Sequence, residues 1–207
     1  MASVLGQVHS GYVHARRVQV LARALSEILP RDARVIDVGC GDGALSELIA
    51  ASRPDVTMTG VDVLVRSNTR IPVKEFDGTK LPFADRSFDV VMFVDVLHHT
   101  IDPNVLLSEA ARVSKRYVVI KDHLRDGLFA EATLRLMDQV GNARHGVALP
   151  YNYWNLKQWD AALFALQLEK KAWRTELGLY PWPASLLFSR GLHFLARLEK
   201  MDQANGD

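Results

Sequence analysis

The sequence predicts an α/β protein built around a doubly wound, mostly parallel sheet. Short apolar stretches of strand length alternate with segments of helical period, which is the pattern of successive βαβ units. The first of these stretches, residues 35–38, is followed by three glycines at every second position, and helical spacing begins at Leu45. A strand, a tight glycine turn and a helix start in this order favour a ligand site at the carboxyl edge of the sheet.

The elements follow from local spacing. A helix is expected over residues 13–29, because Val18, Leu21 and Leu25 recur at helical spacing and Pro30 closes the segment. Strands are expected near residues 34–39, 56–62, 72–76, 88–94, 117–121, 168–177 and 193–198. Further helices are expected near residues 43–51, 103–113, 127–141 and 156–166.

Two details of these elements are specific enough to check. Residues 66–70 are polar and show no periodicity, so the helix that normally follows the second strand is expected to be short or absent. Trp159, Leu163 and Phe164 lie at helical spacing and are expected in the core.

The bulk composition limits the class of protein. At 207 residues, the chain is expected to form one domain over residues 1–207. A net charge of +1 gives no electrostatic reason to expect nucleic acid. The lone Cys40 excludes a disulfide framework and an all-cysteine metal site, and no metal is expected. Residues 1–7 lack the features of a signal peptide and no apolar run reaches about 18 residues, so a cytoplasmic location is expected.

The glycine turn alone leaves two cofactor classes open. Residues 39–44 fit the loose dinucleotide fingerprint, with Asp62 about 20 residues further on as a ribose-binding acid. The carboxylate of Asp37 favours a cofactor that carries positive charge, because a carboxylate beside the turn repels a pyrophosphate.

Four motifs in order over residues 35–120 decide between these classes. They are a D-x-G-x-G-x-G turn at 37–43, a second strand ending in Asp62, the stretch D-G-T-K-L-P-F-A-D-R-S-F-D-V-V at 77–91, and V-D-V-L-H-H at 94–99. In these motifs the chain resembles the class I S-adenosylmethionine (SAM) methyltransferases, in their type 11 small-molecule branch. The resemblance implies SAM as the cofactor and a Rossmann-like sheet of seven strands, mostly parallel with an antiparallel last strand.

The resemblance also implies roles for single residues. Asp62 is expected to accept hydrogen bonds from the ribose hydroxyls, and Asp77 from the adenine amino group. His98 and His99 belong to the family motif, which favours a structural role for them. The expected cofactor set is Asp37, Gly39, Cys40, Gly41, Gly43, Asp62, Val63, Asp77, Gly78 and Asp95.

The acceptor is expected beyond the carboxyl ends of the strands, where the helix 13–29 and the insert 122–155 form a substrate cap. His123 and His145 are the expected general bases, because imidazole titrates near neutral pH. For His123, a role that only supports the loop is equally open. The expected substrate contacts are Tyr12, Arg16, Arg144, Tyr151, Tyr153 and Trp154.

The function that follows is transfer of a methyl group from SAM to an oxygen or nitrogen atom of a small-molecule acceptor. The protein is expected to be a monomer or homodimer with a small-molecule substrate and no nucleic-acid partner. Residues 180–188 are rich in aromatic and leucine side chains, so a lipid methyltransferase in peripheral contact with a membrane is one alternative. A SAM-binding protein without catalysis and an NAD-dependent oxidoreductase are the others.

Overall fold

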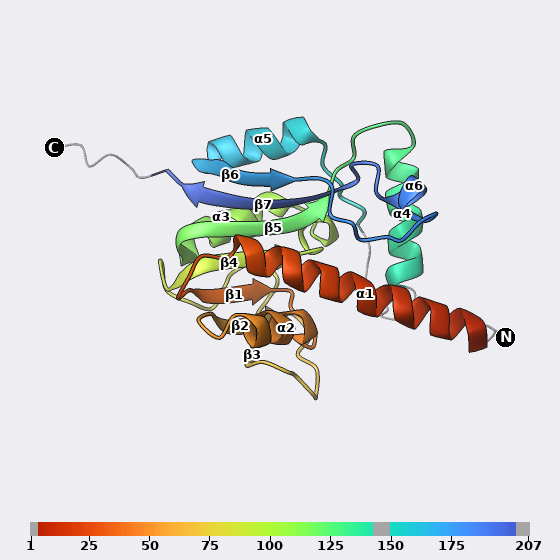
Figure 1. Ribbon diagram of the computed structural model, residues 1–207. Helices are drawn as coiled ribbons and strands as arrows, with labels where there is room; N and C mark the ends of the chain where they lie inside the picture. Colours follow the sequence, from red (N-terminus) through yellow and green to blue (C-terminus); the bar gives the residue numbers. More distant parts are fainter. Residues whose placement is uncertain (1–3, 143–149, 202–207) are drawn as a thin grey trace.

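The computed structural model describes residues 4–142 and 150–201, and the side chains of residues 16–139 and 150–201 (Figure 1). The strands form one seven-stranded sheet in the order β3-β2-β1-β4-β5-β7-β6. They are β1 (Arg34–Val38), β2 (Thr57–Asp62), β3 (Val73–Glu75), β4 (Phe88–Val94), β5 (Ser114–His123), β6 (Leu168–Arg174) and β7 (His193–Lys200). β1 to β5 pair in parallel, and β7 runs antiparallel to both β5 and β6. The predicted fold class is confirmed, including the antiparallel last strand.

Helices cover both faces of the sheet, as a doubly wound fold requires. The described helices are α1 (Val4–Ile28), α2 (Ala44–Ser52), α3 (Pro103–Val113), α4 (Ala130–Asn142), α5 (Leu156–Ala165), α6 (Ser185–Phe188) and the short 3-10 helix η1 (Leu97–His99). Because side chains alternate along a strand, Val35 and Met92 join the apolar cluster of α1 and α2. Ile36 and Phe93 join the second cluster, on the side of α3 and α5.

Three sequence-based expectations meet different outcomes. No helix forms between residues 63 and 72, as expected from their polar sequence. α1 begins at Val4 rather than at residue 13, and the unfavourable helical propensity of Gly11 does not interrupt it. The core placement of Phe164 was wrong: its side chain is 81% exposed, whereas Leu163 is buried. Consecutive residues of an α-helix point about 100° apart, so the two cannot share the same face.

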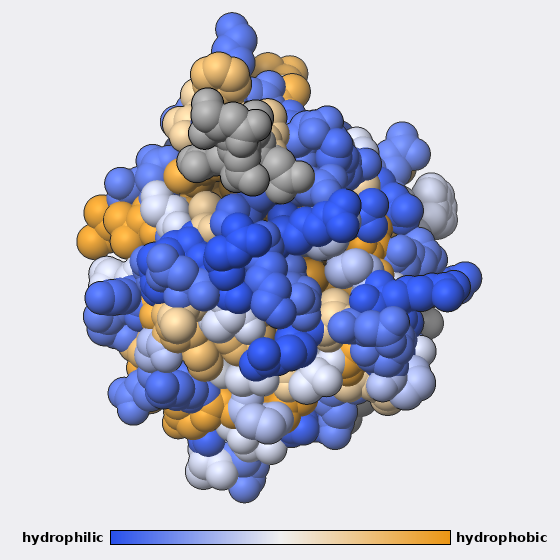
Figure 2. Space-filling model, turned by 90° about the vertical axis from the view of Figure 1, so that its left-hand side faces the viewer, coloured by the Kyte–Doolittle hydropathy of each residue, from blue (hydrophilic) through white to orange (hydrophobic). Residues whose placement is uncertain are grey.

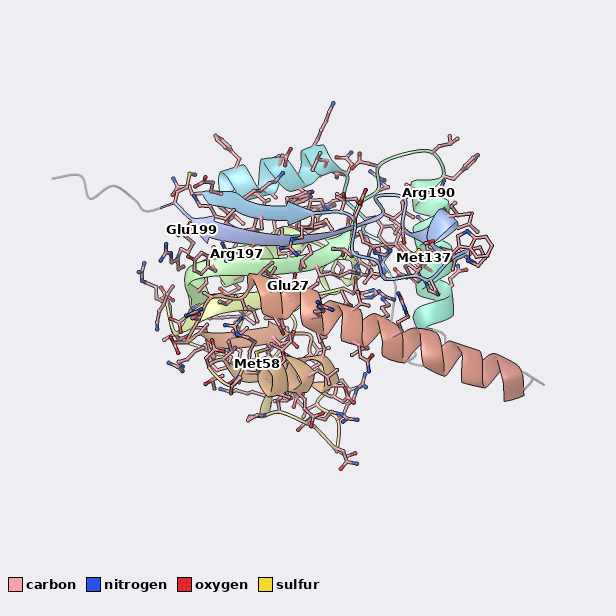
Figure 3. The ribbon with its side chains drawn as sticks, in the orientation of Figure 1. Glu27, Met58, Met137, Arg190, Arg197 and Glu199 are labelled. Carbon is pink, nitrogen blue, oxygen red and sulfur yellow. The ribbon has the colours of Figure 1, made fainter. Side chains whose placement is uncertain are left out.

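The two ends of the sheet differ in character. The arrows of β1 and β5 point toward the end where α4, α6 and the first turns of α1 lie (Figure 1), and Arg190 and Met137 lie at this end (Figure 3). The opposite end, which carries Glu199, is covered mainly by hydrophilic side chains (Figure 2). Among the described helices, none has the length and apolar content needed to cross a membrane. Ligands of open α/β sheets bind beyond the carboxyl ends of the strands, which here is the end with α4 and α6.

Candidate cofactor and acceptor site

The turn between β1 and α2 depends on its three glycines. Gly39, Gly41 and Gly43 have φ values of 74°, 61° and 78°, in the left-handed region that side chains disfavour. A Cβ on Gly39 would lie 2.6 Å from Cγ2 of Val96, and one on Gly43 would lie 2.6 Å from Cγ1 of Ile71. The turn after β1 therefore meets the loop after β4 directly.

Asp62, at the end of β2, holds the shape of this turn. Its Oδ2 accepts a hydrogen bond from the backbone N–H of Gly41 at 2.8 Å, and its Oδ1 accepts one from the N–H of Leu64 at 3.0 Å. Each carboxylate oxygen accepts two hydrogen bonds. Asp62 thus keeps acceptor capacity for a ligand that enters over the turn.

Asp77 lies on the loop after β3 and is exposed. Its Oδ1 accepts bonds of 2.8 Å from the N–H and hydroxyl of Thr79 and from the N–H of Lys80. These backbone and hydroxyl donors lower the pKa of Asp77. Within the described part of the chain, no hydrogen bond ends on Oδ2. Val63 and Gly78 lie beside each other here, since a Cβ on Gly78 would be 3.2 Å from Cγ1 of Val63.

Asp37 and Cys40 lie behind the turn. The Asp37 side chain is 3% exposed and accepts a hydrogen bond of 2.6 Å from the hydroxyl of Ser46 on α2. The Cys40 thiol packs against Gly60, so closely that a Cβ there would overlap its sulfur. Burial, reinforced by the carboxylate of Asp37, raises the pKa of Cys40 to about 12. Both residues belong to the predicted cofactor set, and in this structure their side chains support the turn from within.

Asp37→Asn is expected to stabilise the protein at pH 8 more than at pH 5. Burial raises the pKa of Asp37 from 3.8 to about 7, against a smaller opposite effect of the Ser46 bond. A raised carboxyl pKa means that the folded chain loses stability as pH rises from about 4 to about 7, by up to about 4 kcal/mol. Thermal unfolding of both proteins at the two pH values checks this, and an equal shift at both would contradict it.

The loop after β4 carries an ion-pair group. The carboxylate of Asp95 accepts a bond from Arg17 on α1, at 2.7 Å to Oδ2, and one from the ammonium of Lys121 to Oδ1. Lys121 lies on β5 with no exposed surface, and its Nζ is also 3.4 Å from Nδ1 of His193. Burial alone would raise the pKa of Asp95, but Lys121 and Arg17 hold it well below its usual range. The predicted cofactor contact of Asp95 competes with both of these partners.

A cluster of buried imidazoles lies next to this group. Nδ1 of His98 is 2.6 Å from Oδ1 of Asp122 and 3.2 Å from Nδ1 of His123. Asp122 also accepts bonds from the backbone N–H groups of Leu97 and His123, at 3.0 and 2.7 Å. The ring centroids of His123 and His193 are 4.9 Å apart. The cluster therefore brings together side chains from η1, the end of β5 and the start of β7.

The imidazoles differ in charge. Burial alone would lower the pKa of His98, but the Asp122 carboxylate outweighs it and raises the pKa to about 10. Burial and the neighbouring His98 lower the pKa of His123 to about 4. His98 therefore carries a positive charge at neutral pH, whereas His123 is neutral.

A family model described as a methyltransferase domain matches residues 12–170, more than half of the chain. The chain belongs to this methyltransferase family. Its cofactor is S-adenosylmethionine. The seven-stranded fold agrees: a SAM-dependent methyltransferase structure from Thermotoga maritima, 20% identical, covers 96% of each chain with a TM-score of 0.67.

Two curated methyltransferases are similar to part of the chain. The 27-O-demethylrifamycin SV methyltransferase of Amycolatopsis mediterranei is 33% identical over 108 residues, 45% of this chain and 39% of that protein. The O-methyltransferase rstn1 of Aspergillus nomiae is 31% identical over 139 residues, 54% of this chain and 61% of that protein. The aligned parts thus span less than two thirds of either relative.

The predicted acceptor residues of this methyltransferase are not all brought together. Trp154 is 8% exposed and packs in the main core, with its ring centroid 5.1 Å from that of Trp159. A contact of Trp154 with the acceptor, as predicted, competes with this packing. Tyr153 is also buried, but its hydroxyl donates to Asp138 of α4, and its ring lies 5.6 Å from that of His98.

Two of the remaining predicted contacts have described side chains, and the others lie outside the described part of the chain. Tyr151 is half-buried, with the Arg135 guanidinium 4.9 Å from its ring centroid. Arg16 donates to the carbonyl of Gly178 at 3.2 Å, tying α1 to the segment before α6. Arg144 and His145 lie outside the described residues, as does the side chain of Tyr12.

Proposed function

We propose that this chain transfers the methyl group of SAM to an oxygen or nitrogen atom of a small-molecule acceptor. The observation that carries the proposal is the direct contact between the glycine turn at Gly39 and the loop after β4 at Val96. The contact sets the cofactor turn beside the loop that leads to the buried imidazoles. Methyl transfer is an in-line displacement that depends on alignment of donor and acceptor, so the two sites must adjoin.

In this proposal, two carboxylates and the turn hold the cofactor. Asp62 accepts from the ribose hydroxyls with its remaining lone pairs, and Oδ2 of Asp77 accepts from the adenine amino group. Val63 and Gly78 flank the adenine, and the glycine backbone permits close approach at the turn. Asp37 and Cys40 support the turn without touching the cofactor.

We infer that an oxygen acceptor gives its proton to His123. His123 is the neutral imidazole of the buried cluster, which is the form that a general base needs. Both curated relatives described above are named for O-methylation, which supports oxygen as the acceptor atom.

Release of S-adenosylhomocysteine tests the proposal. The full chain is incubated with SAM in the presence of one acceptor mixture at a time. The mixtures are phenols, carboxylic acids, amines and a cell extract. We expect turnover that requires an acceptor. Tight SAM binding in calorimetry with no turnover on any mixture would identify a SAM-binding protein without catalysis. Binding of NAD in place of SAM would overturn the proposal as a whole.

A second candidate, an amphiphilic lipid acceptor, is favoured by the apolar surface at the α4 and α6 end. Six large apolar side chains there are between 53% and 79% exposed: Leu128, Phe129, Leu136, Trp182, Leu186 and Leu187. Exposed tryptophan and leucine side chains insert into the headgroup region of membranes. Co-sedimentation with liposomes tests this candidate. We expect binding that Trp182→Ala weakens; recovery of the wild-type protein only in the supernatant would exclude it.

A further inference from the structure

Two imidazole nitrogens on η1 make no hydrogen bond within the described residues, although one of them lies 3.4 Å from a carboxylate oxygen of Asp138. They are Nε2 of His98 and Nδ1 of His99, both screened from solvent. A buried polar atom without a partner costs about 1–3 kcal/mol, so proteins rarely keep one without a ligand. Both nitrogens belong, with the carboxylate of Asp138, to a group of atoms that all lie within 4.8 Å of one another.

We propose that His98 Nε2, His99 Nδ1 and the Asp138 carboxylate bind one divalent transition-metal ion. Two imidazoles and one carboxylate favour ions such as Zn²⁺, Fe²⁺ or Co²⁺, whereas Mg²⁺ and Ca²⁺ prefer oxygen ligands. This proposal differs from the sequence-based expectation of no metal, which was based on the single cysteine of the chain. It is a binding site in its own right and does not depend on the reaction proposed above.

The other side of His98 is arranged as in known metal sites. Its Nδ1 faces Oδ1 of Asp122 at 2.6 Å. When Nδ1 donates its proton to Asp122, the lone pair is on Nε2, where a metal ligand needs it. Histidines that bind metals almost always donate the opposite N–H to a carboxylate or carbonyl in this way. Asp122 is itself fixed by the backbone N–H groups of Leu97 and His123, so the ring orientation is set before an ion arrives.

The third ligand, the carboxylate of Asp138, is also held in position by a neighbouring side chain. Oδ2 of Asp138 lies 3.4 Å from Nε2 of His98, a separation that matches two ligands about 2.1 Å from one tetrahedral ion. The hydroxyl of Tyr153 donates to the same carboxylate oxygen and thereby orients it. The His98 and His99 rings are 4.0 Å apart between centroids, so both nitrogens reach the same space from η1.

Charge supports a cation at this position. The carboxylates of Asp122 and Asp138 flank His98 on its two nitrogens. The nearby cations Lys121 and Arg17 are paired with Asp95.

The test is metal titration of the full chain, prepared without a histidine tag and stripped with a chelator. We expect one Zn²⁺ per chain by calorimetry, and visible absorption of Co²⁺ typical of nitrogen and oxygen ligands. His99→Gln and Asp138→Asn should each weaken Zn²⁺ binding by at least about tenfold, and Asp122→Asn by about 10- to 100-fold. Cys40→Ser removes the chain's one thiol and should leave the Zn²⁺ affinity unchanged.

His99→Gln is the deciding variant, because His99 is half-buried and its Nδ1 makes no hydrogen bond to the described residues, so the fold tolerates the change. Absence of saturable binding to the wild-type protein would overturn the proposal. So would wild-type affinity in His99→Gln, or loss of binding in Cys40→Ser alone. None of these outcomes depends on whether the chain transfers a methyl group.

Discussion

Asp62→Ala is expected to weaken SAM binding by at least about 100-fold while the chain stays folded. In the proposed complex, the Asp62 carboxylate accepts from two ribose hydroxyls, and each charge-assisted bond contributes about 1.5–3 kcal/mol. Every 1.4 kcal/mol is about tenfold in affinity, so two lost bonds exceed a factor of 100. The variant also loses the bonds to Gly41 and Leu64, which lets the glycine turn move away from its binding conformation.

Calorimetry with SAM and S-adenosylhomocysteine measures the loss, and thermal unfolding without ligand confirms the fold. Asp62→Asn keeps one side-chain oxygen and should fall between wild type and Asp62→Ala. Glu169→Ala, on β6 at the far edge of the sheet, is the matched control and should bind SAM normally. A folded Asp62→Ala protein with affinity within twofold of wild type would remove Asp62 from the cofactor site.

The fold was predictable because its signals are local. Alternating strand and helix periods, and glycines at every second position, specify the βαβ order and the turn after β1 without any long-range information. The departures have local causes too. Phe164 fell on the exposed face of α5 because spacing locates a helical stripe only to within one residue on either side.

The polar cluster was only partly predictable, because its members come from distant segments. The sequence drew attention to His123 and Asp95, but it did not indicate that Lys121, Asp122 and His193 are buried with them. One signal was available: three consecutive polar residues end β5, and a strand covered on both faces must bury them. Which groups then pair depends on the register of β5 with β7, where His123 lies opposite His193.

Asp95→Asn is expected to destabilise the protein by about 3–5 kcal/mol, because it leaves the ammonium of Lys121 buried without its carboxylate partner. Lys121 has no exposed surface, so water cannot replace the lost partner. Arg17 loses the same partner, which weakens the attachment of α1 to the loop after β4. The lowered pKa of Asp95 adds a pH signature: its stabilising effect is present above the ordinary carboxyl pKa and is lost only in strong acid.

Lys121→Met in the Asp95→Asn background separates this electrostatic cost from a packing defect. If the unpaired ammonium causes the loss, removing it should restore much of the stability, because a buried pair replaced by groups of similar volume is close to neutral. Urea unfolding of both single variants and the double variant at pH 7 gives the coupling free energy. Additive losses would mean that Asp95 and Lys121 contribute independently. A coupling free energy of several kcal/mol would show that Asp95 and Lys121 stabilise the fold as a charged pair. This pair would then fix the loop after β4 beside the cofactor turn.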